Sequence, residues 1–157
     1  KILKDSKKIS KKNREILYKY IKKNSYWSIG SASLKEIEKL NILYASLLAM
    51  SRAIKKLKMK PTLVLIDGNK IPKIKNYNLK NIIKGDQKVK EISAASIIAK
   101  VSRDRLIEKI SKKYLKYSWK KNAGYCTKKH LLAIKKFGIT KYHRRKFKPI
   151  HNILSLK

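Results

Sequence analysis

The sequence of 157 residues carries 43 Lys and Arg against nine Asp and Glu, giving a formal net charge of +34, and it has one cysteine. Its length suits a single domain, 1–157, and Cys126 alone excludes an internal disulfide. The longest apolar run, 42–50, is far short of the ~20 residues that span a bilayer, and no secretory signal follows the first lysines. We therefore expect a protein of the reducing cytoplasm with no membrane partner.

The excess of positive charge has two readings. A chain this basic is attracted to polyphosphate, because each phosphate it neutralises releases counterions. Yet only six of the 43 basic residues are arginines, and the guanidinium group of arginine matches the geometry of a phosphate better than the ammonium group of lysine. Much of the charge therefore also fits a solvated background, so it suggests nucleic acid without establishing it.

The first third of the chain predicts helices and one strand. The segment 10–24 has helical spacing of apolar residues, and 26–32 has the aromatic and β-branched content of a strand. Ser33 and Glu36 form a capping box before a short helix, and Asn41 is placed to cap a longer one. The predicted buried side of the first helix consists of Ile16, Leu17, Tyr20 and Ile21.

The rest of the chain alternates buried strands with helices. The run 62–67 is continuously apolar, as in a strand covered on both faces, and 79–86 predicts a second strand. A helix is expected from about Glu91 to Tyr114, and Thr127 caps another helix, which Gly138 ends. This order predicts an α/β layered sheet with a helical, basic C-terminal region.

Two of the nine acidic residues lack an ordinary role. The others suit helix caps, favourable helix positions or surface ion pairs; for example, Asp104 lies next to Arg103. Asp67 and Asp86 each end a predicted strand and each adjoin a glycine. At the carboxyl edge of a sheet the two would bind a hard cation such as Mg²⁺ or Mn²⁺. A plain turn and a plain strand end explain them equally well.

Several segments, taken together, resemble bacterial ribonuclease HII. They are "DSKKIS", "WSIG", "EIEKLNILYASLLAMSRAI", "LVLIDGNKIP", "KGDQKVKEISAASIIAKVSRD", "GYCTKKHLLAI" and "HRRKFKPI", in the family's order from Asp5 to about Ile150. The resemblance implies a ribonuclease H-like mixed sheet flanked by helices. It also implies an endonuclease that cuts the RNA strand of RNA–DNA hybrids and incises duplex DNA at single ribonucleotides, in replication and repair. The expected ends are a 5′-phosphate and a 3′-hydroxyl, produced by two-metal catalysis with Mg²⁺ or Mn²⁺.

The resemblance also implies roles for particular residues. Asp67 in "LIDGN" and Asp86 in "KGD" match two of the family's four catalytic, metal-binding carboxylates. Tyr125 in "GYCT" matches the tyrosine that stacks on the sugar at the ribose–deoxyribose junction. Cys126 stands where relatives often carry Gly or Pro. The further substrate contacts that the resemblance suggests are Thr127, Lys84, Ser93, His143, Arg144 and Arg145. For His143, Arg144 and Arg145, a solvated basic tail at 143–148 is an equally good reading.

One family feature has no match in these 157 residues. The family's first strand bears "DEAGRGP", which supplies the other two carboxylates and a contact to the 2′-hydroxyl, and no such segment occurs here. Two strands of the family's sheet are thus expected to be missing, and the metal site is expected to be half built. We expect a monomer. The alternatives are a non-catalytic basic RNA-binding protein and a remnant that binds hybrids without cutting them.

Overall fold

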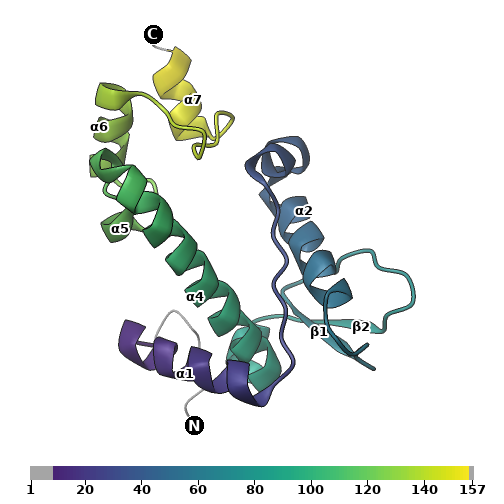
Figure 1. Ribbon diagram of the computed structural model, residues 1–157. Coiled ribbons are helices and arrows are strands. Elements are labelled where there is room, and N and C mark those ends of the chain that lie inside the picture. The colour runs from purple at the N-terminus through teal and green to yellow at the C-terminus, as the bar shows by residue number, and fades with distance from the viewer. Residues whose placement is uncertain (1–8, 156–157) are drawn as a thin grey trace. The chain divides into compact units, whose positions relative to one another are not determined.

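The computed structural model describes residues 9–155. Its elements are α1 (Lys11–Asn24), α2 (Leu34–Lys55), β1 (Val64–Asp67), β2 (Leu79–Ile82), α3 (Gly85–Lys88), α4 (Lys90–Lys113), the 3-10 turn η1 (Leu115–Tyr117), α5 (Trp119–Asn122), α6 (Lys128–Phe137) and α7 (Lys148–Ser155) (Figure 1). They form two compact units: unit 1 runs to Ala32 and takes Ile42–Val101, while unit 2 holds Ser33–Asn41 and continues from Ser102. The single domain expected over 1–157 stays a prediction.

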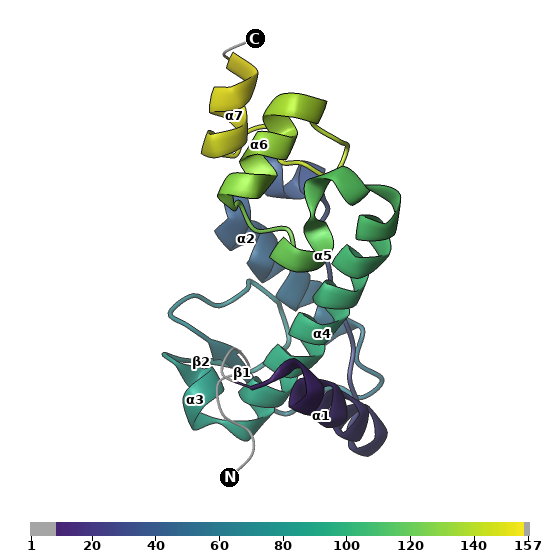
Figure 2. The ribbon, with the colours of Figure 1, turned by 90° about the vertical axis from the view of Figure 1, so that its left-hand side faces the viewer.

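The sheet of unit 1 is a parallel pair. β1 and β2 lie side by side with Asp67 opposite Ile82, and the Gly68 amide donates to the Ile82 carbonyl at 3.0 Å (Figure 2). Both strands were predicted, although each is shorter than its apolar run. Within residues 9–155 the sheet has two strands. A parallel pair of strands with helices before and after it in the chain confirms the predicted α/β class.

The strand predicted over 26–32 is wrong. This segment is extended but pairs with no strand, and it lies against the second part of α2. The Ser28 hydroxyl donates to the Ala53 carbonyl. Gly30 is so close to the helix that a Cβ there would overlap backbone atoms of Ala49 and Ala53. The β-prone composition therefore reflects an extended chain packed on a helix, where packing overrides β propensity.

The core of unit 1 lies between α1 and the first half of α4 (Figure 2). The helix α1 begins as predicted, with the Ser10 hydroxyl accepting from the Asn13 amide at 3.2 Å. Its buried face is rotated from the prediction, because Ile16 is 58% exposed and Tyr20 is 65% exposed. The buried cluster consists of Tyr18, Ile21, Ile97, Ile98 and Val101. Burying this apolar surface stabilises the unit by roughly 25 cal/mol per Å² removed from water.

The predicted break before the long helix is confirmed. The Ser33 amide donates to Glu36 at 2.7 Å, and the Glu36 amide donates back to the Ser33 hydroxyl at 3.3 Å, which completes the capping box. Asn41 has φ 66° and ψ 174°, so the helical hydrogen-bond pattern of α2 is interrupted there. A separate helix therefore begins after Asn41, as the predicted capping role of Asn41 implies.

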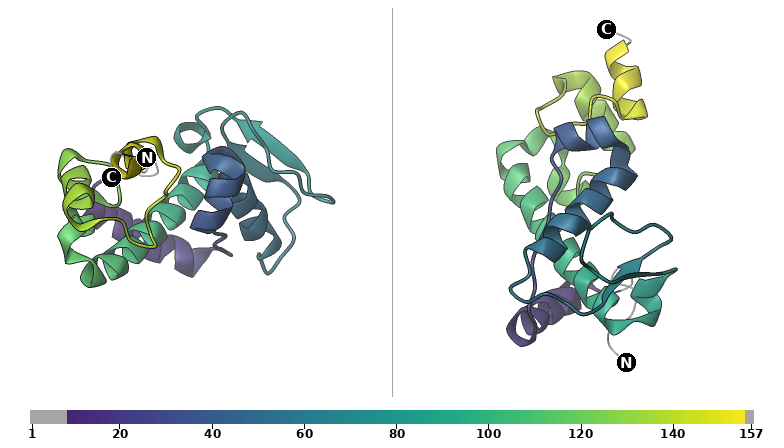
Figure 3. Two further views of the ribbon diagram at one scale, coloured as in Figure 1. Left: turned by 90° about the horizontal axis from the view of Figure 1, so that it is seen from above. Right: turned by 90° about the vertical axis from the view of Figure 1, so that its right-hand side faces the viewer.

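The core of unit 2 is aromatic and aliphatic. It consists of Tyr117, Trp119, Ile134, Ile150 and Ile153, contributed by η1, α5, α6 and α7 (Figure 3). Both predicted ends of α6 are confirmed. The Thr127 hydroxyl accepts from the His130 amide at 3.3 Å, and Gly138, at φ 78°, follows the last helical residue. This backbone angle favours glycine over residues that carry a Cβ.

Candidate active site

Asp67 is held at the carboxyl edge of the parallel strands. It is the last residue of β1, it is exposed, and its Oδ1 accepts a hydrogen bond of 2.8 Å from the Gly85 amide at the start of α3. Gly85 is buried, and a Cβ there would lie 2.5 Å from Cδ1 of Ile92, so a larger residue would require the Ile92 side chain to shift. Asp86 follows directly and is half-buried. Two carboxylate-bearing residues therefore meet at one edge.

One detail of the prediction is corrected. Asp86 does not end a strand, because β2 stops at Ile82 and Asp86 lies in the single turn of α3. Lys84 makes this possible by adopting φ 56° before the turn. Its side chain is exposed, so the predicted substrate contact by Lys84 is sterically open.

The residues at this edge suit a hard cation in part. Carboxylate oxygens are the donors that Mg²⁺ and Mn²⁺ prefer, and here the Gly85 amide fixes one of them. Across residues 9–155, no group of three or more His, Cys, Asp and Glu side chains is placed to bind a metal ion. Asp67 and Asp86 lie close together at this edge, and their role as metal ligands stays a prediction.

Tyr125 lies in the exposed loop between α5 and α6. Its side chain is 62% exposed, and Cys126 and Thr127 beside it are exposed as well. The turn before it has positive φ at Ala123 (49°) and Gly124 (78°). An aromatic ring this open is available for stacking, while Thr127 also has its confirmed role as the helix cap.

Two predicted substrate contacts are buried. Ser93 has 0% exposure and a hydroxyl without a hydrogen-bond partner, so it is a packing residue at the start of α4. His143 is 7% exposed. Neither Ser93 nor His143 is open to a phosphate here, which corrects both assignments.

The residues of the basic segment 143–148 therefore differ in how exposed their side chains are. His143 stacks on His130 with ring centroids 5.2 Å apart, and Arg144 lies over the Phe147 ring at 5.2 Å. Arg145 is exposed, and its backbone amide donates to the Glu38 carboxylate at 2.7 Å. Of these residues, Arg145 has the side chain most open to a phosphate.

Burial governs the protonation of His143. It lowers the pKa of the imidazole from 6.5 to about 4, with a smaller contribution from the nearby His130. The Thr140 amide donates to Nδ1 of His143 at 2.8 Å, which places the proton of the neutral ring on Nε2. At neutral pH His143 is therefore uncharged and acts as a packing side chain.

We expect acid to destabilise the protein through His143. Between pH 6.5 and about 4 the unfolded chain binds a proton at this residue and the folded protein does not, so the free energy of unfolding falls as the pH falls. The loss is at most about 3 kcal/mol. His143→Phe should flatten this part of a plot of Tm against pH, whereas His151→Gln, an exposed control, should leave the slope unchanged. An unchanged slope in His143→Phe would contradict the assignment.

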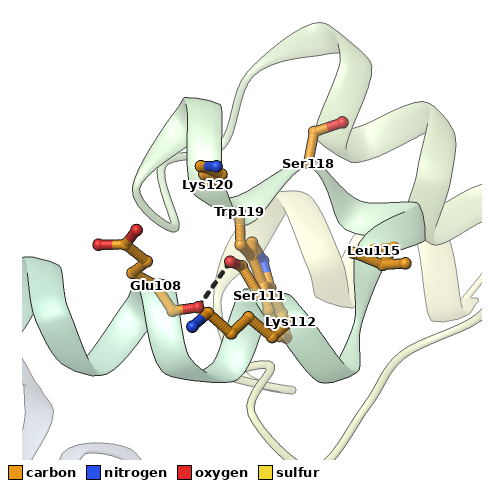
Figure 4. Close-up of a pocket in the computed structure, with 7 residues that line it drawn as sticks. All are labelled: Glu108, Ser111, Lys112, Leu115, Ser118, Trp119 and Lys120. Atoms are coloured by element: carbon orange, nitrogen blue, oxygen red, sulfur yellow. Dashed lines mark hydrogen bonds between the residues drawn. The ribbon is translucent and has the colours of Figure 1, made fainter.

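Two small pockets of unit 2 are lined by residues other than the predicted carboxylates. The first, of about 180 Å³, is lined by Glu108, Ser111, Lys112, Leu115, Ser118, Trp119 and Lys120 (Figure 4). In it the Ser111 hydroxyl donates to the Glu108 carbonyl at 2.7 Å. The second, of about 290 Å³, includes Lys35, Lys141 and Arg145 in its wall. Asp67 at the end of β1 is itself exposed.

Sequence reasoning missed one residue beside Tyr125. Arg103 was assigned only a surface ion pair with Asp104, and that contact is present at 3.9 Å. The same guanidinium also donates to the Ala123 carbonyl at 3.0 Å and lies over the Tyr125 ring at 5.6 Å. The sequence did contain an indication of this role. Arginine is rare among the basic residues of this chain, so an arginine in place of a lysine indicates a position where a planar guanidinium group is needed.

Comparison with solved structures defines the class. The crystal structure of the ribonuclease H2 from Pyrococcus horikoshii OT3 superimposes with a TM-score of 0.78 at 25% sequence identity, covering 98% of this chain and 81% of that one. The fold is therefore the α/β fold of ribonuclease H-type enzymes.

Sequence comparison gives the family. The model of the ribonuclease HII family matches residues 2–150. The ribonuclease HII of Pelagibacter ubique (strain HTCC1062) is 68% identical over 154 residues, which are 98% of this chain and 83% of that protein. The ribonuclease HII of Borreliella burgdorferi is 53% identical over 150 residues, 96% of this chain and 83% of that protein. The chain belongs to the ribonuclease HII family, and it is a hydrolase of the endoribonuclease type.

One structural finding bears on the prediction that the protein has no membrane partner. In the described part of the chain, no helix combines the length and apolar composition needed to cross a membrane.

Proposed function

We propose that this chain cuts the RNA strand of RNA–DNA hybrids and incises duplex DNA at embedded ribonucleotides, leaving 5′-phosphate and 3′-hydroxyl ends. The observation that supports this most is the hydrogen bond from the Gly85 amide to Asp67, next to Asp86. It holds the Asp67 carboxylate at the sheet edge against the residue that precedes Asp86, a placement that suits a metal-assisted phosphodiester hydrolysis. We also propose that the protein acts in the cytoplasm as a monomer.

Asp67 and Asp86 would hold Mg²⁺ or Mn²⁺, together with carboxylates from a strand of the "DEAGRGP" type. When bound, a pair of such cations supplies activation of a water molecule and stabilisation of the leaving 3′-oxygen. The chain's own contribution is to orient the ligands. The Gly85 amide holds the Asp67 carboxylate by a hydrogen bond. The backbone of Lys84 is in the left-handed conformation and turns the chain into α3, which carries Asp86.

The exposed cations and Tyr125 would bind the substrate. Nucleic-acid affinity comes mainly from neutralised phosphates, and Lys84 and Arg145 present exposed side chains for this purpose. Arg144 is half-buried and would contribute mainly through the position of its loop. Tyr125 would stack on the sugar where ribose gives way to deoxyribose, and Thr127 would set the loop's exit as the cap of α6.

A cleavage assay on the full-length enzyme tests this function. One substrate is a duplex DNA with a single ribonucleotide, and the other is a hybrid with a continuous RNA strand. With Mg²⁺ or Mn²⁺ we expect both to be cut, with a ligatable 5′-phosphate and a 3′-hydroxyl that a polymerase extends. Chelation with EDTA should stop the reaction. Cleavage that persists in EDTA, or ends with a 3′-phosphate, would exclude the proposed chemistry.

A further inference from the structure

The loop that carries Tyr125 has a conformation its sequence does not favour. Ala123 and Gly124 have consecutive positive φ values of 49° and 78°, and for alanine this left-handed conformation is unfavourable. Local hydrogen bonds hold part of the turn: the Gly124 amide donates to the Asn122 side chain at 2.9 Å, and the Tyr125 amide donates to the Asn122 carbonyl at 2.8 Å. These bonds shape the backbone and leave the tyrosine ring open.

Arg103, on α4, makes the contacts that reach this loop from another element. Its Nη1 donates to the Ala123 carbonyl at 3.0 Å, and the guanidinium carbon lies 5.6 Å from the centre of the Tyr125 ring. Nη2 is 3.5 Å from the position a Cβ would occupy on Gly124. One planar group thus contacts Ala123 and Tyr125 and lies beside Gly124, the residue between them. Lysine, with a single ammonium group, cannot hold the carbonyl and cover the ring at once.

We propose that Arg103 is a positioning residue for substrate discrimination: it fixes the turn at Ala123 and Gly124 and supports one face of the Tyr125 ring, so that the ring stacks on the sugar at the ribonucleotide junction. This rests on the proposed role of Tyr125 in cleavage. The Tyr125 ring remains 62% exposed with the guanidinium in place, so a substrate has access to it. The contact with Asp104, at 3.9 Å, restrains the guanidinium further.

The proposal predicts which kinetic constant changes. Affinity for a long duplex comes from many phosphate contacts, so losing the support of one ring should leave KM nearly constant. Misplacing the ring lowers kcat, because a contact that aligns the reacting sugar matters at the transition state. For Arg103→Ala in the full-length enzyme we expect kcat on the single-ribonucleotide duplex to fall about tenfold. The loss on a continuous RNA–DNA hybrid, which offers many sites, should be smaller.

Three further variants separate positioning from charge. Arg103→Lys keeps the charge and should remain closer to Arg103→Ala than to the parent enzyme in kcat. Lys109→Ala removes a charge from an exposed side chain of the same helix and should leave kcat and selectivity unchanged. Tyr125→Ala should lower kcat on the single-ribonucleotide duplex, and in that background Arg103→Ala should cost little more, because the two residues act through one contact.

The opposite results would overturn the proposal. They are full recovery of kcat by Arg103→Lys, additive losses in the double variant, or an effect of Arg103→Ala on KM alone. Amide hydrogen exchange guards against a folding defect: in Arg103→Ala, protection should fall in 123–127 and persist in the core of unit 2. Global loss of protection would make Arg103 a stability residue and count against the proposal. If the parent enzyme cut neither substrate, the proposed function itself would fail, independently of Arg103.

Discussion

Asp67→Asn in the full-length enzyme is expected to abolish cleavage of both hybrid and single-ribonucleotide substrates. The amide keeps the shape and still accepts a hydrogen bond from Gly85, but it loses the charge that a divalent cation requires. Metal-assisted stabilisation of the transition state amounts to several kcal/mol, and a loss of about 4 kcal/mol is about a thousandfold in rate. The measurement is the single-turnover rate with Mg²⁺ and with Mn²⁺.

Binding should survive the same substitution. Asp67 makes no phosphate contact in the proposed complex, and removing a negative charge from a basic protein does not weaken attraction to the backbone. The Kd for an uncut hybrid, measured by fluorescence anisotropy in EDTA, should match that of the parent enzyme. Glu15→Gln removes a carboxylate on α1 and should leave both rate and Kd unchanged. Retention of most cleavage by Asp67→Asn would show that Asp67 is not a metal ligand.

Local chemistry explains what the sequence predicted well. The capping box of Ser33 and Glu36 and the ends of α6 at Thr127 and Gly138 each depend on residues within four positions of one another. Such signals are readable because one side chain satisfies a specific amide or allows a specific φ. The first of the paired strands was predicted for a similar reason, since a continuous apolar run that ends at Asp67 is typical of a strand covered on both faces.

Tertiary packing explains what the sequence did not give. The segment 26–32 has the composition of a strand, but its environment is the backbone of α2, at Gly30. The face of α1 is set by Ile97 and Ile98 of α4, so Tyr18 is buried and Tyr20 is not. These outcomes depend on partners distant in sequence, which propensity and periodicity do not contain.

The candidate site shows the same division. The pairing of Asp67 with Asp86 came from counting acids and from strand ends, and the structure puts both residues at one edge. The burial of His143 depends on packing against His130 of α6. The conformation of the Tyr125 loop depends on a hydrogen bond from Arg103 of α4. A basic run such as 143–148 gives no sign of which member faces inward. The substrate roles of Tyr125 and Arg145 stay predictions.

The polypeptide of residues 1–157, produced by itself, is expected to cut no hybrid with either metal. Whatever flanks these residues in the cell, they supply Asp67 and Asp86 but no segment of the "DEAGRGP" type. Two carboxylates are half of what the family's site uses. In residues 9–155 the sheet is a two-stranded pair, and such a pair is marginally stable alone. The measurement is cleavage of a labelled hybrid over the salt range in which the protein binds it.

The same polypeptide is expected to aggregate readily and to bind nucleic acid weakly. Leu63, just before β1, is 45% exposed, and Ile83, just after β2, is 60% exposed. Apolar surface therefore lies beside the strand edges. Binding through a net charge of +34 should weaken steeply as salt rises. Adding a segment that carries the Asp-Glu strand, fused or in trans, should restore metal-dependent cutting and solubility together, because one strand supplies both the ligands and the missing edge. Robust cutting by 1–157 alone would show that two carboxylates suffice and that the strand is dispensable.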